Sequence, residues 1–195
     1  MLLNTDFQII EVFLGDYGRE LTGSAIARLK DLNQKTVSMH LKMLENQAIL
    51  KSRTDGRNKL FSLNIDNKEI VKHVLISIEH FRTARFFERH APLGNLSGKM
   101  QQHIKGSAAI FGSYVKGTQK RSSDLDVLII GDCDEDAIEE LGELHGLEIN
   151  LKIYPGYESD VLIREALEHH IFVKNAENMI EVVLDEQDRM VSGDK

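Results

Sequence analysis

Hydrophobic and polar residues in the first part of the chain are spaced as in three short helices. Apolar positions predict a helix over residues 6–14, and residues 21–29 predict a second, short helix. Asn33 is a suitable N-cap for a third helix, which has one apolar and one polar side. The apolar side consists of Val37, Leu41, Leu44 and Ala48. The polar side carries Gln34, Lys35, Ser38 and Lys42.

A β-hairpin is predicted after these helices. Residues 48–53 and 59–63 favour strands, and the turn between them contains Asp55-Gly56, a strong hairpin signal. Residues 28–59 hold eight Lys or Arg against three Asp or Glu, although the whole chain has a net charge of -7. A basic face at one end and an acidic body at the other indicate two different partners.

A long helix is predicted over residues 67–89, which contain neither Gly nor Pro. Its apolar positions recur at spacings of three and four, which gives one continuous seam. The seam consists of Val71, Val74, Ile78 and Phe81. It can pack on its own domain, on the next domain, or on a second copy of the chain in a homodimer. Pro92 and Gly94 then mark a domain boundary.

The remaining residues alternate between helical and strand patterns. Strands are predicted at 107–111, 124–130 and 147–154, with a short extended piece at 171–173. Helices are predicted at 96–105, 134–145, 160–169 and 176–185. This order indicates a mixed sheet covered by helices, so the predicted fold class is α+β. The predicted domains are residues 1–66, a connecting helix over 67–93, and residues 94–195.

Composition adds limits but no specific chemistry. The chain has 195 residues, 42% of them hydrophobic, which is enough for two modest domains with packed cores. No apolar run is long enough to cross a membrane, and the amino terminus lacks a signal-peptide pattern, so a cytoplasmic protein is expected. Cys133 is the only cysteine, which excludes an intrachain disulfide.

Residues 110–130 combine the chemistry that phosphoryl transfer needs. Gly112-Ser113 opens a turn, a basic segment follows, and Asp124 and Asp126 stand two residues apart at an apolar run. In an extended strand, side chains two residues apart point to the same face. The two carboxylates therefore form an oxygen site that suits Mg²⁺.

The amino-terminal pattern resembles the winged helix-turn-helix domains of prokaryotic transcription regulators, over roughly residues 5–65. The resemblance implies that the third helix enters the major groove of double-stranded DNA and that the hairpin, or wing, rests on the backbone. It assigns base or phosphate contacts to Gln34, Lys35, Ser38 and Lys42, and phosphate contacts to Arg53, Arg57 and Lys59. The alternative is a solvated face on a domain used for dimerisation or protein contact.

A second resemblance rests on Phe111-Gly112-Ser113, Lys116-Gly117 and Ser123-Asp124-Leu125-Asp126. These motifs resemble the signature of polymerase-beta-like nucleotidyltransferases, especially the minimal prokaryotic members. The resemblance implies that Asp124 and Asp126 hold Mg²⁺ at the triphosphate of an NTP, with ATP the expected donor, and that pyrophosphate leaves. It also implies that phosphates are bound by Gly112, Ser113 and Lys116, with Lys120 or Arg121 as further cations.

Active members of this family carry a third carboxylate on the neighbouring strand. The aligned position here is Asn150, whereas Glu148 lies one pleat earlier on the same side of the predicted strand, and Lys152 one pleat later. Glu148 is longer than aspartate, so it is the candidate third metal ligand and catalytic residue. If Glu148 does not reach the metal, Asn150 leaves the site with two carboxylates and an amide.

The sequence therefore predicts a DNA-binding regulator that carries a Mg²⁺-dependent nucleotidyltransferase domain. The acceptor is expected to be a protein or a small molecule, and the family resemblance makes a small helical protein partner plausible. The alternative is a transcription regulator whose nucleotidyltransferase fold is inactive and serves nucleotide sensing or oligomerisation.

Overall fold

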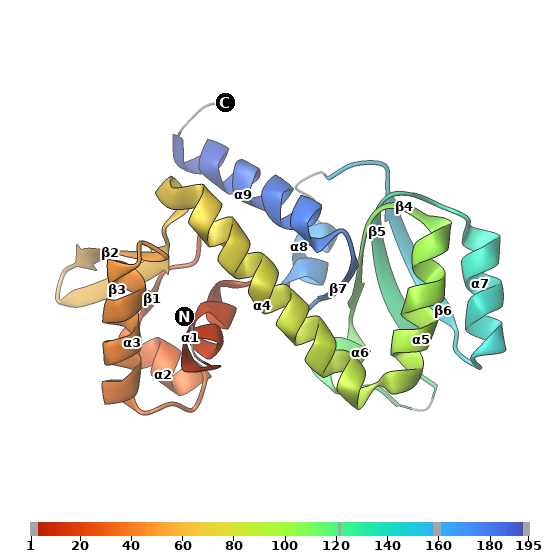
Figure 1. Ribbon diagram of the computed structural model, residues 1–195, viewed down its shortest axis with the longest axis horizontal. Coiled ribbons are helices and arrows are strands. Elements are labelled where there is room, and N and C mark those ends of the chain that lie inside the picture. The colour runs from red at the N-terminus through yellow and green to blue at the C-terminus, as the bar shows by residue number, and fades with distance from the viewer. Residues whose placement is uncertain (1–3, 121, 158–160, 193–195) are drawn as a thin grey trace. The chain divides into compact units, whose positions relative to one another are not determined.

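The computed structural model of the chain describes residues 4–120, 122–157 and 161–192 (Figure 1). The chain divides into two compact units, Met1–Ile78 with Val183–Lys195, and Glu79–Val182. Two helices, α4 (Lys68–Arg89) and α9 (Ala176–Ser192), contribute residues to both units. The boundaries at residues 66 and 93 stay predictions. Within the described residues, no helix is both long enough and apolar enough to span a membrane.

The first unit is built from short helices and one small sheet. Thr22 and Asn33 cap the second and third helices by accepting hydrogen bonds from backbone amides, and the cap at Asn33 confirms the sequence prediction. The antiparallel sheet has the order β1-β3-β2, and Gly56 with Arg57 forms the tight turn between β2 and β3. The elements are α1 (Asn4–Ile10), β1 (Leu21–Thr22), α2 (Gly23–Leu29), α3 (Gln34–Asn46), β2 (Leu50–Asp55) and β3 (Asn58–Leu63).

Two details of this unit correct the sequence prediction. Residues 21 and 22 are not helical but pair with β3 as a short strand. Ala48 does not belong to the apolar side of α3, because the helix ends at Asn46 and Ala48 has a φ of 56°. The buried side of α3 instead includes His40, whose Nδ1 lies 2.7 Å from Asp6 Oδ1. A buried side-chain hydrogen bond between His40 and Asp6 therefore adds polar residues to a side of the helix that the sequence predicts to be apolar.

The long helix α4 was placed correctly, but its buried side differs from the prediction. Val71, Leu75 and Ile78 are fully buried, whereas Val74 is half-buried and Phe81 is 37% exposed. The predicted seam and the observed buried positions both have helical spacing, so the spacing alone does not decide which side of the helix is buried.

The second unit has the predicted mixed sheet, of order β6-β5-β4-β7. Strand β5 (Leu125–Cys133) runs parallel to β6 (Ile149–Tyr154) and antiparallel to β4 (Ile104–Phe111), which pairs antiparallel with β7 (Ile171–Lys174). Figure 1 shows α5 and α7 on one face of this sheet. The helices apart from α4 and α9 are α5 (Ala91–Met100), α6 (Ser113–Lys116), α7 (Glu135–Leu144) and α8 (Val161–Glu168).

The start of α5 corrects a further expectation. Pro92 lies in the first turn of this helix, where a missing backbone N–H costs nothing, and Gly94 is also helical. The helix predicted over residues 96–105 therefore begins earlier, at Ala91, and ends at Met100. The apolar core of the unit lies between α5, α7 and one face of the sheet. It includes Leu93, Leu96, Met100, Ala108, Ile110, Leu125, Val127, Ile129 and Ile138.

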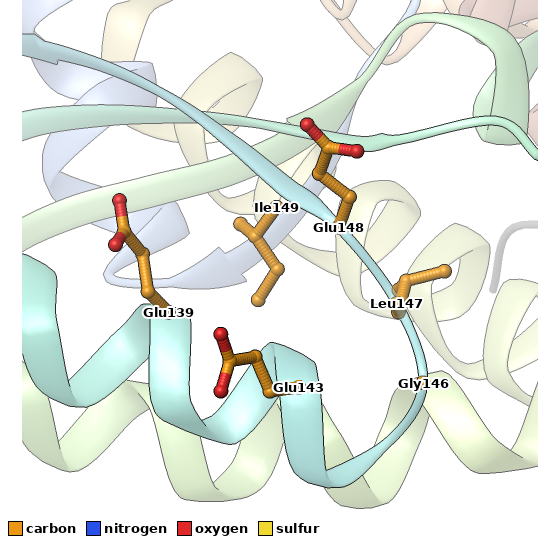
Figure 2. A pocket seen from close by; sticks show the side chains of 6 residues that line it. All are labelled: Glu139, Glu143, Gly146, Leu147, Glu148 and Ile149. Carbon is orange, nitrogen blue, oxygen red and sulfur yellow. The ribbon is translucent and has the colours of Figure 1, made fainter.

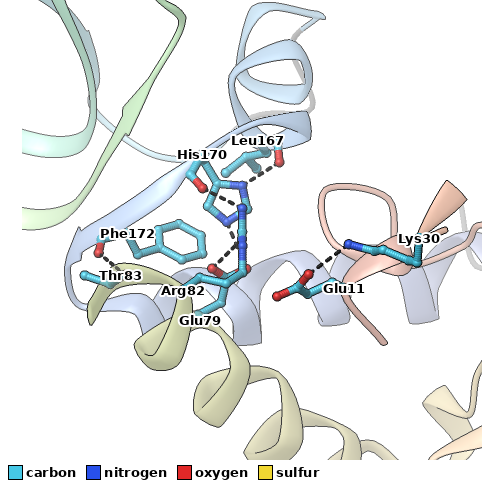
Figure 3. Close-up of polar contacts among 8 residues, drawn as sticks. All are labelled: Glu11, Lys30, Glu79, Arg82, Thr83, Leu167, His170 and Phe172. Atoms are coloured by element: carbon cyan, nitrogen blue, oxygen red, sulfur yellow. Dashed lines mark hydrogen bonds and ion pairs between the residues drawn. The ribbon is translucent and has the colours of Figure 1, made fainter. Parts of the chain in front are cut away.

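A buried polar cluster joins α4 to the segment between α8 and β7 (Figure 3). Glu79 is fully buried, and its carboxylate contacts Arg82 Nη1 at 2.7 Å and His170 Nε2 at 3.0 Å. Arg82 also donates to the His170 carbonyl at 2.9 Å, and His170 Nδ1 donates to the Leu167 carbonyl. No local sequence pattern predicts this cluster, because Glu79 and His170 are 91 residues apart.

Burial disfavours a charged Glu79, but its partners reverse that effect. Burial raises the pKa of the Glu79 carboxyl, while the charges and hydrogen bonds of His170 and Arg82 lower it more, so the net pKa lies below the usual value. The stabilisation that Glu79 gains from His170 and Arg82 is therefore present above the ordinary glutamate pKa of about 4.3. It is lost as the pH falls through the lowered pKa of the folded state.

Replacing Glu79 with alanine should destabilise the protein strongly. The change leaves the Arg82 guanidinium and the buried His170 ring without their carboxylate partner, and breaking a buried pair in this way typically costs about 3 to 5 kcal/mol. Glu88→Ala, at an exposed position of the same helix, is the matched control and should cost less than about 0.5 kcal/mol. Denaturant unfolding at neutral pH measures both, and equal costs for the two variants would show that the cluster contributes nothing.

Candidate active site

The turn after β4 brings backbone against a carboxylate. Gly112 has φ 74° and ψ −145°, a conformation that side chains rarely allow, and it directly precedes the single-turn helix α6. A Cβ atom added to Gly112 would lie 2.1 Å from Asp126 Oδ2. Only glycine therefore fits at this position, and its backbone adjoins the Asp126 carboxylate.

The two aspartates lie where the sequence pattern predicts. Asp124 is exposed one residue before β5, and Asp126 is half-buried within this strand. Leu125 and Val127, which alternate with them, are completely buried. Asp126 pairs with Phe111 of β4 on one side and with Asn150 of β6 on the other. Three adjacent strands therefore fix its position.

Asn150 stands directly opposite Asp126 and contacts it. Its side-chain Nδ2 donates a hydrogen bond to Asp126 Oδ1 at 2.9 Å. The strand register thus places an amide, not a carboxylate, at the neighbouring-strand position beside Asp126. An amide neutralises none of a cation's charge, so this arrangement binds divalent ions less strongly than three carboxylates would.

Glu148 is exposed at the residue before β6, and its carbonyl accepts a hydrogen bond from the Leu125 amide at 2.8 Å. Figure 2 shows its side chain pointing away from α7, whereas Ile149 points toward that helix. Across the described part of the chain, no three His, Cys, Asp or Glu side chains form a group that could hold a metal ion. Asp124, Asp126 and Glu148 are therefore not gathered around one point.

A pocket of about 540 Å³ lies between α7 and the start of β6, but its charge is wrong for a nucleotide (Figure 2). Three glutamates line it, and like charges there would repel a triphosphate. Its lining residues are Glu139, Glu143, Gly146, Leu147, Glu148 and Ile149.

Hydrogen bonds that the sequence did not reveal hold the loop before Asp124. Tyr114 Oη donates to the Ser123 carbonyl at 3.3 Å, and Ser123 Oγ accepts from the Lys120 amide at 2.8 Å. Lys116 and Lys120 are exposed beside this loop, and Arg121 lies outside the described residues. No spacing rule links Tyr114 to Ser123, so this contact is visible only in the folded structure.

The residues proposed to bind DNA lie on the surface of the first unit. Gln34, Lys35, Ser38 and Lys42 are all exposed on α3. On the hairpin, however, two of the three basic residues have acidic partners: Arg53 pairs with Glu20, and Lys59 Nζ lies 2.8 Å from Glu45 Oε2.

These pairs affect the acids as well. The hydrogen bond from Arg53 lowers the pKa of Glu20, and the hydrogen bonds from Lys59 and Ser52 lower the pKa of Glu45. Both acids therefore stay ionised near neutral pH and offset the hairpin's positive charge. Of the three predicted basic residues, Arg57 at the hairpin turn retains the most exposed charge.

Comparison with known proteins finds a family match for the part of the chain that contains the Gly112 turn and the two aspartates. Residues 94–182 match the family described as "Nucleotidyltransferase domain", and this match supports nucleotidyltransferase activity. A solved structure described as "Crystal structure of the toxin-antitoxin with AMP-PNP" is 19% identical to the chain, with a TM-score of 0.38. The alignment covers 51% of this chain and 90% of that chain. Among curated proteins, none matches.

Nucleotidyltransferase domains generally use divalent metal ions, and the side chains at the starts of β5 and β6 have the chemistry, although not the grouping, of a site for such an ion. The side chains of Asp124 and Asp126 end in carboxylate oxygens, and Asn150 adds one amide oxygen. Hard cations prefer oxygen ligands of this kind. The Asp126 carboxylate fills the space that a side chain at position 112 would need, so the glycine turn lies directly against this carboxylate.

Substituting Gly112 tests whether the turn positions Asp126. Gly112→Ala should destabilise the domain and abolish binding of NTP with a divalent cation, because the new methyl group displaces the Asp126 carboxylate. Gly117→Ala is the matched control, since Gly117 also has a positive φ of 68° but nothing within 4 Å of its Cβ position. It should cost about 1 to 2 kcal/mol of stability through backbone strain alone and retain binding. Calorimetric titration measures binding, and retained binding in Gly112→Ala would contradict this assignment.

Proposed function

We propose that the chain transfers a nucleoside monophosphate from an NTP, ATP foremost, to a protein or small acceptor, with release of pyrophosphate. The observation that carries this proposal is the Gly112 turn packed against Asp126 within the segment that matches a nucleotidyltransferase domain. The turn and the carboxylate together provide a place for phosphate oxygens beside a cation site.

Each residue of the site has a proposed task. Asp124 and Asp126 hold a divalent cation, proposed to be Mg²⁺, and Glu148 approaches from the start of β6 as a third ligand. When bound, this cation neutralises triphosphate charge and lowers the barrier to attack on the α-phosphorus. Ser113 donates hydrogen bonds to the phosphates, and Lys116 offsets their charge.

A second candidate function follows from Asn150. Its hydrogen bond to Asp126 at 2.9 Å occupies one carboxylate oxygen with a donor. This contact supports a fold that binds nucleotide weakly or without turnover and serves nucleotide sensing or oligomerisation. A homodimer and a small helical protein partner also stay predictions of the sequence.

Transfer from an α-labelled NTP tests the enzymatic proposal. Wild-type protein with Mg²⁺ and cell extract should label an acceptor, whereas Asp126→Asn should lose at least about a hundredfold of the signal, because one metal ligand is gone. Asp136→Asn, at an exposed position of α7, is the matched control and should label as well as wild type. If wild type labels nothing with ATP, GTP, CTP or UTP, the enzymatic proposal is wrong and the sensing alternative remains.

We also propose that the first unit is a winged helix that binds double-stranded DNA. Its order of elements, with α3 followed directly by the β2–β3 hairpin and the sheet order β1-β3-β2, supports this reading. The exposed polar face of α3 supports major-groove contact by Gln34, Lys35, Ser38 and Lys42. On the hairpin, Arg57 is the main phosphate contact, and Arg53 and Lys59 contribute after they leave their acidic partners.

The salt dependence of DNA affinity tests this second proposal. Lys35→Ala should weaken binding to DNA fragments and reduce the slope of log affinity against log salt concentration by about 1, since one phosphate contact is lost. Lys99→Ala, an exposed lysine of α5, should change neither quantity. A wild-type protein without salt-dependent DNA binding would instead support a domain that contacts protein.

A further inference from the structure

Two methionines are exposed on the same face of α3 as the residues proposed to bind DNA. Met39 is 56% exposed and Met43 37% exposed. They lie one helical turn apart and alternate along this face with Ser38 and Lys42. Their apolar side chains are not part of the core, because Val37, Leu41 and Leu44 fill the inner side of the helix.

The charge around the methionines identifies the kind of partner. The outward positions of α3 carry Lys35 and Lys42 and no carboxylate, since Glu45, the only acid of the helix, is bound by Ser52 and Lys59 of the hairpin. Exposed Arg28 at the end of α2 and Arg57 at the hairpin turn add positive charge to the same unit. Such a surface is complementary to the phosphates that border a DNA groove.

In the major groove of DNA, the apolar group that a side chain can meet is the C5 methyl of thymine. A methionine is unbranched and polarizable, so it adapts its shape to such a contact. Met39 and Met43 are separated by about 6 Å along the helix axis, a distance comparable to two base steps. The exposed neighbours Ser38 and Lys42 are polar and can form hydrogen bonds with the groups that surround such a methyl.

We propose that Met39 and Met43 recognise thymine methyl groups, and that the DNA target therefore contains thymines within about two base pairs of each other at the centre of the α3 contact. This inference rests on the proposed DNA binding of the first unit. It adds sequence specificity, which phosphate contacts alone do not provide.

Replacing thymine by uracil removes only the methyl group and provides the test. Sites bound by the wild-type protein are first selected from random double-stranded DNA, and each thymine of the selected site is then changed to uracil. Wild type should bind about fourfold more weakly for each contacted methyl that is lost, which corresponds to the burial of one methyl group. Met39→Ala and Met43→Ala should each remove the preference at one thymine.

The controls separate this inference from the function on which it rests. Met39→Leu keeps an apolar side chain and should keep a thymine preference, and Leu144→Ala, 79% exposed on α7, should leave DNA affinity unchanged. If wild type binds the selected site equally well with thymine and uracil, the methyl contacts do not exist, although DNA binding stands. If selection recovers no DNA at all, the DNA-binding proposal fails, and the face of α3 is then a protein-contact surface.

Discussion

The close approach of Gly112 to Asp126 is the contact on which the candidate site depends. A glycine with positive φ ends β4, and the missing Cβ leaves space for a carboxylate from β5. Because Asp126 is also paired with β6, the turn, the carboxylate and the neighbouring strand are fixed in one register. The apolar core on the other side of β5 holds that register, since Leu125 and Val127 are fully buried.

Asn150 decides how this geometry is used. In the strand register it faces Asp126, where another carboxylate would strengthen cation binding, and it donates a hydrogen bond instead. The local charge is therefore less negative than in a three-carboxylate site, so repulsion between carboxylates is smaller before a cation binds. In the proposed site, a cation would compete with the amide for Asp126, and Glu148, which is not grouped with the two aspartates, would have to move toward them.

Local signals explain which parts of the fold were predictable. The cap at Asn33 and the spacing of Asp124 and Asp126 depend only on neighbouring residues, so both could be predicted from the sequence. The prediction of which side of α4 is buried was wrong in part, because two overlapping sets of apolar positions both have helical spacing. The Glu79 cluster depends on His170, which is distant in the chain and is brought near only by folding. The pairing of Arg53 and Lys59 with acids was missed for the same reason.

Binding of an NTP with Mg²⁺ tests the central claim most directly, because both the active and the sensing alternatives require it. Calorimetric titrations should show Mg²⁺-dependent binding to wild type and none to Asp126→Asn. Asn150→Asp should bind the cation more tightly, because a carboxylate replaces the amide beside Asp126. Binding that is the same in all three proteins would contradict the assignment of a nucleotide site to the ends of β4, β5 and β6.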